Sequence, residues 1–61
     1  MKASEAFAAW CDGQRVEIEC AYGWQRVRLF RLEWSGLQAT FHNGVTEVVT
    51  HAAGREYRVA P

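Results

Sequence analysis

The chain has 61 residues, of which 49% are hydrophobic and 23% are charged, so it suits one small folded domain and is too apolar for a disordered segment. A domain of this length buries only about 60% of the surface that its unfolded chain exposes, so its stability is marginal. Seven basic and seven acidic residues give zero net charge. This balance excludes the strongly basic composition of a simple electrostatic nucleic-acid binder and favours self-association.

The ends of the chain and its cysteines indicate a cytoplasmic protein. No stretch approaches the roughly 20 apolar residues of a membrane span, so we expect no membrane association. Glu5 interrupts the first residues, which therefore do not have the pattern of a signal peptide. Without an export signal, Cys11 and Cys20 are expected to be free thiols in a reducing compartment.

A short helix is predicted over residues 4–11. Ser4 is the expected N-cap, Glu5 lies near the positive end of the helix dipole, and Asp12-Gly13 ends the helix. Two helical turns do not persist alone, so the helix must dock on the rest of the chain. The residues at helical spacing that we expect to face the core are Ala3, Phe7 and Trp10.

After Gly13 the hydrophobic period changes to two, and glycine-containing turns recur at regular intervals. Asn43-Gly44, between two alternating segments, is the strongest of these hairpin signals. The whole chain, residues 1–61, is therefore predicted to be a single domain in which the helix is followed by a five-stranded antiparallel meander. The predicted strands span residues 14–21, 24–34, 37–42, 45–50 and 55–59.

If each glycine-marked pair is a two-residue loop, the opposing residues follow by counting. A loop at Tyr22-Gly23 sets apolar pairs on one face and opposite charges on the other, as cross-strand energetics favours. The pairs expected from this loop are Ile18 with Val27, Val16 with Leu29, Glu19 with Arg26, and Glu17 with Arg28.

The same counting assigns the later strands. A loop at Ser35-Gly36 places Phe30 opposite Phe41, and the Asn43-Gly44 loop turns Val45 and Val49 outward. A four-residue loop over residues 51–54 would join the last two strands as a hairpin. The pairs expected from it are Val48 with Tyr57, Thr46 with Val59, and Glu47 with Arg58.

The second predicted strand contains one irregularity. Its apolar residues change face between Leu29 and Phe30, and such a change inside a long strand indicates a bulge or a sharp bend. A five-stranded meander with a bent second strand can close into a small barrel, with the helix over one open end. The predicted fold class is thus mainly β, a small Sm-like or SH3-like barrel.

A short helix, five strands and a bent second strand resemble the Sm-like superfamily. Residues 43–52, Asn-Gly-Val-Thr-Glu-Val-Val-Thr-His-Ala, are similar to the fourth strand of its bacterial branch, the host-factor RNA chaperone Hfq, in which that strand ends in Tyr-Lys-His-Ala. His51-Ala52 matches the His-Ala, whereas Val49 and Thr50 replace the aromatic residue and the cation that the family uses at its uridine-binding pore. This resemblance implies a bacterial or phage RNA-binding protein that forms a homo-oligomer.

A second Sm-like relative, the small Rho-binding antiterminator, has a central Val-Val-x-x-Ala-Ala-Gly run. Residues 48–54 of this chain, Val-Val-Thr-His-Ala-Ala-Gly, resemble it. That similarity implies a protein partner, a component of a nucleic-acid machine, in place of RNA itself.

The sequence offers little support for catalysis or metal binding. His42 and His51 lie about 20 Å apart on an extended strand, so one subunit cannot place both on one metal ion. No nucleophile elbow, phosphate loop or zinc-protease motif is present. We therefore predict a protein that is not an enzyme, with no catalytic residue, no metal and no cofactor.

Two binding functions remain. Aromatic and basic residues could stack bases and hold phosphates of RNA, although the predicted Glu17 and Glu19 pairs would neutralise two of the arginines. Outward valines beside an unpaired strand edge could instead bind a protein partner or a second copy. The candidate nucleic-acid residues are Trp24, Arg26, Arg28, Arg31, His51 and Arg55, and the candidate interface residues are Val45, Val49, Tyr57 and Arg58.

Overall fold

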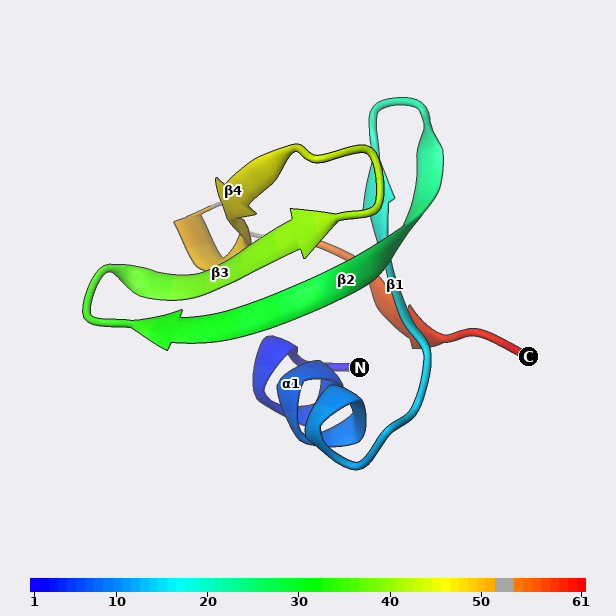
Figure 1. Ribbon diagram of the computed structural model, residues 1–61, viewed down its shortest axis with the longest axis horizontal. Helices are drawn as coiled ribbons and strands as arrows, with labels where there is room; N and C mark the ends of the chain where they lie inside the picture. Colours follow the sequence, from blue (N-terminus) through cyan, green and yellow to red (C-terminus); the bar gives the residue numbers. More distant parts are fainter. Residues whose placement is uncertain (52–53) are drawn as a thin grey trace.

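Five antiparallel strands form one sheet in the order β4-β3-β2-β1-β5, with a helix packed beneath it (Figure 1). The computed structural model describes residues 1–51 and 54–61. In chain order the elements are α1 (Ala3–Cys11), β1 (Val16–Cys20), β2 (Gly23–Glu33), β3 (Gly36–Phe41), β4 (Thr46–Val48), the 3-10 helix η1 (Val49–His51) and β5 (Tyr57–Val59). The prediction of one helix followed by five antiparallel strands is confirmed.

The last strand does not form the expected hairpin with β4. After β4 the chain turns through η1, and β5 pairs with β1 at the far edge of the sheet, with Tyr57 opposite Ile18 and Val59 opposite Val16. The predicted pairing of β5 with β4 is therefore wrong, because η1 redirects the chain before a tight turn can form. Residues 52–53 of the predicted loop lie outside the described residues.

The expected barrel is not closed. Strands β4 and β5 are the two edges of the sheet, and no ladder joins them in the described residues. The two edges are nevertheless linked by side chains, because the guanidinium of Arg55 donates to the Glu47 carboxylate at 2.5 Å. The fold is thus an open sheet whose ends are drawn together by an ion pair.

The first two hairpins form in the predicted places but with shifted registers. Ile18 lies opposite Gln25, not Val27, because the turn residues are Ala21 and Tyr22 and Gly23 is already the first residue of β2. Gly36 likewise begins β3, so Phe30 lies opposite Ala39, not Phe41. Each shift moves a partner by two positions. Because side-chain direction alternates with period two, Val16, Ile18 and Phe30 still face the core despite the wrong pairing.

The third hairpin shifts by one position and therefore changes faces. The loop contains His42, Asn43 and Gly44, closed by hydrogen bonds between Phe41 and Gly44 and between Phe41 and Val45. Thr46 then lies opposite Thr40, and Val48 opposite Gln38, in place of the partners expected from a two-residue loop. A shift of one position reverses side-chain direction, and η1 follows directly after β4. Val49 is therefore fully buried, and its predicted outward direction is wrong.

Strand β2 has the predicted bend, but it lies before Leu29 and not after it, so the expectation that Leu29 faces the core with Val16 is wrong, and Leu29 is 37% exposed. Val27 lies opposite Phe41 and Leu29 lies opposite Thr40, so Arg28 is an extra residue on β2. This bulge separates two inward residues of the strand, Val27 and Phe30, by three positions. Both halves of the sheet consequently face one core.

Helix α1 docks on the sheet through aromatic rings. Phe7 and Trp10 each contact the ring of Phe30 edge to face, with centroids 6.0 Å apart in both pairs. The helix begins one residue earlier than expected, so Lys2, not Ser4, is the N-cap, and its backbone N–H donates to the Glu5 carboxylate at 2.7 Å. The fully buried residues with less than 2% exposure include Ala6 of the helix, Val16, Ile18, Ala39 and Val49.

Gly36 is the glycine on which the η1 turn depends. Its φ is +134°, and a Cβ added there would lie 2.3 Å from Thr50 Oγ1 and 2.9 Å from Val48 Cγ1. The same Thr50 hydroxyl accepts a hydrogen bond from the Leu37 backbone N–H at 3.1 Å. A side chain at position 36 would therefore strain the backbone and also displace η1 from β3.

We expect Gly36→Ala to lower the free energy of unfolding by about 2–4 kcal/mol, the sum of left-handed backbone strain and overpacking. Gly23→Ala is the matched control, because its φ is +101° but nothing lies within 4 Å of an added Cβ. It should cost only the backbone strain, about 1–2 kcal/mol. Urea denaturation measures both. Equal losses for the two variants would show that the contact of Gly36 with Thr50 contributes nothing.

Candidate nucleic-acid interface

A basic hollow lies between the C-terminal end of α1 and the bulged part of β2. It has a volume of about 340 Å³. Trp10 comes from α1, Arg15 from the segment before β1, Arg26 and Arg28 from β2, and His42 from the turn after β3. The remaining residues that line it are Gly13, Gln14 and Val27.

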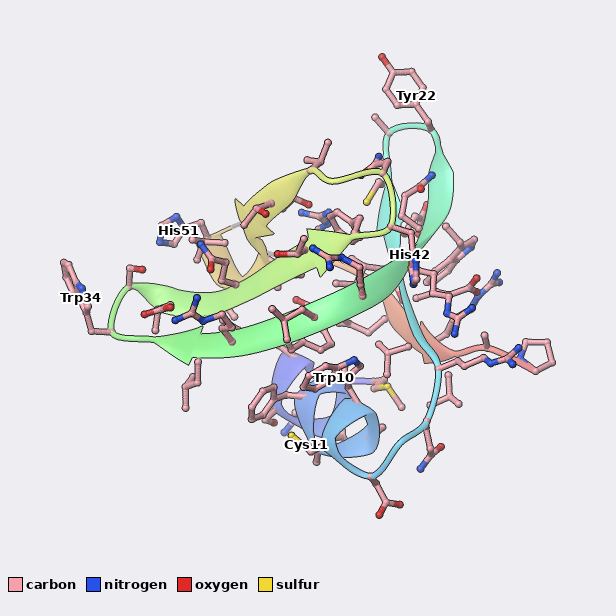
Figure 2. All side chains as sticks on the ribbon, viewed as in Figure 1. Trp10, Cys11, Tyr22, Trp34, His42 and His51 are labelled. Carbon is pink, nitrogen blue, oxygen red and sulfur yellow. The ribbon has the colours of Figure 1, made fainter. Side chains whose placement is uncertain are left out.

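The bulge explains why these side chains meet. Arg28 is the extra residue of β2, and the backbone N–H of His42 donates to the Arg26 carbonyl at 3.4 Å at the same place. The end of β3 is thereby held against β2, with His42 beside the two arginines. Figure 2 shows His42 at this end of β3, above Trp10 of the helix. Four separate segments thus contribute to a single concave surface.

The distribution of ion pairs gives this hollow its positive charge. Of the seven Lys and Arg residues, one is Lys2 and six are arginines. In the described residues three arginines form ion pairs, with Arg31 bound to Glu33, Arg55 to Glu47 and Arg58 to Glu17. The other three, Arg15, Arg26 and Arg28, line the basic hollow, and no described carboxylate lines it with them.

The prediction that Glu17 and Glu19 neutralise the strand arginines is wrong. Glu17 lies opposite Arg26 in the ladder, but its carboxylate accepts from Arg58 Nε at 2.7 Å. Glu19 lies opposite Trp24. The register shift of the first hairpin thus leaves Arg26 and Arg28 without an ion-pair partner in the part of the chain that the structure describes.

Two of the predicted nucleic-acid residues line the basic hollow, and the other four lie elsewhere. Trp24 is covered by the guanidinium of Arg58, whose Cζ lies 4.1 Å from the ring centroid. Arg31 forms its ion pair with Glu33 toward the far end of β2, at 3.3 Å. His51 contacts the Ser35 carbonyl at 3.0 Å through Nε2. Trp24 and Arg31 therefore serve other contacts of the sheet.

Arg55 belongs to a second concavity, which we call the sheet-edge hollow, with a volume of about 640 Å³. Besides Glu47, its guanidinium donates to the Glu19 carbonyl at 3.1 Å and to Cys20 Sγ at 3.3 Å. The hydrogen bond to the Glu47 carboxylate raises the pKa of Arg55 above its ordinary value, although partial burial opposes this. Arg55 thus links β1 with β4. The residues lining the sheet-edge hollow are Glu19–Tyr22, Gln25, Phe41, Asn43, Val45, Glu47 and Gly54–Glu56.

The four predicted interface residues do not form one exposed surface. Val45 is 53% exposed, whereas Val49 and Tyr57 belong to the core. Arg58 is held by Glu17 and lies over Trp24. Of the two valines expected to face outward, only Val45 does so.

Sequence reasoning missed three residues of the basic hollow. Trp10 was assigned only to the buried stripe of the helix, yet it is half-buried and lines the hollow with its remaining surface. Arg15 and His42 lie in connecting segments. The alternation of side chains along strands does not predict where the side chains of such segments point. The available signal was the change of face after Leu29, because a bulge brings neighbouring loops and strand residues together.

The histidines and cysteines do not gather into a metal site in the described residues, where no group of three potential metal-ligating side chains occurs. Figure 2 shows His51 and His42 toward opposite ends of β3. Cys11 is an exposed free thiol, and Cys20 is a half-buried one.

Comparison with known proteins finds no matching family model, no matching curated protein and no matching solved structure. The described residues also include no helix with the length and apolar character that crossing a membrane requires.

The burial of Tyr57 in the core can be tested through the pH dependence of stability. Burial raises the pKa of its phenol above the ordinary value of 10.0, the charge of Glu47 adds to this, and Arg55 opposes it. The unfolded chain therefore loses this proton at lower pH than the folded chain. Its contribution to stability is complete below about pH 10 and is lost as the pH rises through the folded-state pKa.

We expect the free energy of unfolding of the wild type to fall as the pH rises above about 10 and the fall to be smaller in Tyr57→Phe. Tyr22→Phe is the control, because Tyr22 is 96% exposed. Chemical denaturation followed across this pH range measures the effect. The same slope in Tyr57→Phe and the wild type would contradict the assignment.

Proposed function

We propose that this protein is a non-enzymatic module that binds single-stranded nucleic acid, RNA in the first instance, through the basic hollow. The observation that carries the proposal is that Arg15, Arg26 and Arg28, the arginines without an ion pair in the described chain, line one concavity with Trp10 and His42. Three cations gathered without a carboxylate repel one another in the free protein. A bound anion relieves that repulsion, and guanidinium groups suit phosphate oxygens especially well.

The shape and the aromatic residue favour a single strand. A volume of about 340 Å³ lies near the small end of ligand sites and suits a phosphate with its attached sugar or base. Trp10 offers an aromatic surface beside the guanidinium groups, the combination with which proteins hold unpaired bases. Zero net charge limits long-range attraction, so affinity must come from this local cluster.

The N-terminal helix and the bent β2 support the proposal that this module is Sm-like. The proposed protein is cytoplasmic and comes from a bacterium or a phage. Its proposed working form is a homo-oligomer. A single hollow holds little of a nucleic-acid strand. Repetition of the hollow around an oligomer would raise the affinity for one strand, because each further contact becomes intramolecular.

A protein-interaction module is the second candidate function. The exposed Leu32 and Trp34, with 74% and 99% of their surfaces in solvent, favour it. Salt separates the two functions, because nucleic-acid affinity falls steeply with rising salt whereas an apolar protein contact changes little.

The nucleic-acid proposal predicts that the double variant Arg26→Ala/Arg28→Ala loses affinity for a fluorescently labelled single-stranded oligoribonucleotide in an anisotropy titration. Each lost phosphate contact lowers the slope of log affinity against log salt by about 0.7, so the double variant should lose about 1.4 from the wild-type slope.

Arg31→Ala is the matched control, since it removes an arginine of the same strand that is bound to Glu33. It should leave both the affinity and the slope near their wild-type values. If the double variant binds like the wild type, or if Arg31→Ala is equally weakened, the basic hollow is not the site.

A further inference from the structure

The tip of the β2–β3 hairpin carries two large apolar residues that are mostly in solvent. Trp34 is 99% exposed and Leu32 is 74% exposed. Leu32 alternates with the buried Phe30 and therefore points toward the core side of β2, but the hairpin extends past the helix that covers Phe30 (Figure 1). We call Leu32 and Trp34 the apolar tip. Its exposure costs free energy that burial in a partner would recover.

The sheet-edge hollow has apolar and acidic residues in its lining that could surround an indole ring. Its apolar lining includes Cys20, Phe41 and Val45, and the carboxylate residues Glu19 and Glu56 also line it. Neither carboxylate has a side-chain partner among the described hydrogen bonds and ion pairs. An indole ring has one polar atom, a donor N–H, so an apolar cavity with free carboxylate acceptors suits it chemically.

The tip cannot reach the hollow of its own chain. Figure 2 shows Trp34 at the left-hand end of the molecule and Tyr22, which lines the sheet-edge hollow, well away from it at the top. The longest dimension of the molecule is 30 Å, and a rigid hairpin separates the two surfaces. A tip that enters this hollow must therefore belong to a different copy of the chain.

We propose that the apolar tip of one copy inserts into the sheet-edge hollow of a second copy. The cavity of about 640 Å³ is large enough for an indole with part of Leu32 beside it. Zero net charge places no long-range repulsion between copies. The occupant is a second copy because the same chain supplies both an uncovered indole and an apolar, carboxylate-bearing cavity of matching chemistry.

The contact joins two different surfaces, so it is head to tail. An open chain of copies keeps a free tip at one end and a free hollow at the other until a ring closes, and association therefore proceeds to rings or chains. A buried tryptophan contributes about 150–250 Å² of contact surface, and a contact centred on one hairpin tip falls at the small end of specific interfaces. We therefore expect association that depends on concentration and that reverses on dilution.

Sedimentation velocity over a concentration series tests the contact, with Trp34→Ala removing the tip and Val45→Asp placing a charge in the hollow. Each variant alone should have at least about tenfold weaker self-association than the wild type. Leu29→Ser is the control, because Leu29 is also exposed on β2 but lies on the other face from Phe30. It should associate like the wild type. Circular dichroism confirms that each variant is folded.

Mixing the two defective variants gives the decisive result. Trp34→Ala keeps an intact hollow and Val45→Asp keeps an intact tip, so an equimolar mixture should form a heterodimer and no larger species. If Val45→Asp alone associates like the wild type, or if the mixture stays monomeric, the head-to-tail contact is overturned. A wild type that is monomeric throughout, with Trp34 protected only when nucleic acid or an unrelated protein is added, also overturns it.

This inference and the proposed nucleic-acid site can fail separately. The basic hollow shares no residue with the apolar tip or the sheet-edge hollow. If Trp34→Ala loses self-association but its monomer binds nucleic acid like the wild type, the head-to-tail contact is supported. The nucleic-acid site is then tested separately by Arg26→Ala/Arg28→Ala.

Discussion

The bulge in β2 is the constraint on which the rest of this structure depends. One extra residue, Arg28, lets a single strand direct Val27 and Phe30 into the same core although they are three positions apart. Without it, the alternation of a regular strand would turn one of these two side chains into solvent. A chain of 61 residues has few apolar side chains to spare, so this irregularity contributes directly to the stability of the domain.

The same bulge organises the functional surfaces. It places Arg26 and Arg28 beside His42 and the end of the helix, where the basic hollow forms. Beyond the bulge, β2 continues with β3 as a hairpin that ends in Trp34, far from that hollow (Figure 2). A basic concavity, an apolar tip and the sheet-edge hollow are thus separate surfaces of one small fold. Separate surfaces allow a module to bind a ligand and associate with itself without competition.

Much of the fold follows from the alternation of apolar residues, whereas the pairing does not. Val16 and Ile18 face the core as expected even though their predicted partners on β2 are wrong, because a shift of two positions preserves side-chain direction. Val49 shows the opposite case, since a three-residue turn and η1 changed its direction. Two of the predicted arginines lie in the basic hollow, but Arg15 and His42 were missed because alternation does not place residues of loops. The pairing of β5 with β1 follows η1, a short 3-10 helix that the alternation of apolar residues does not predict.

An NMR titration with a single-stranded oligoribonucleotide distinguishes the basic hollow from the apolar tip as the binding surface, because it reports which residues the nucleic acid contacts. The account predicts that the indole N–H of Trp10 and the backbone amides of Arg26 and Arg28 shift together, at a protein concentration where the chain is monomeric. The indole N–H of Trp34 should stay in place under the same conditions. Shifts centred on Trp34, with Trp10 and the bulge unperturbed, would contradict it.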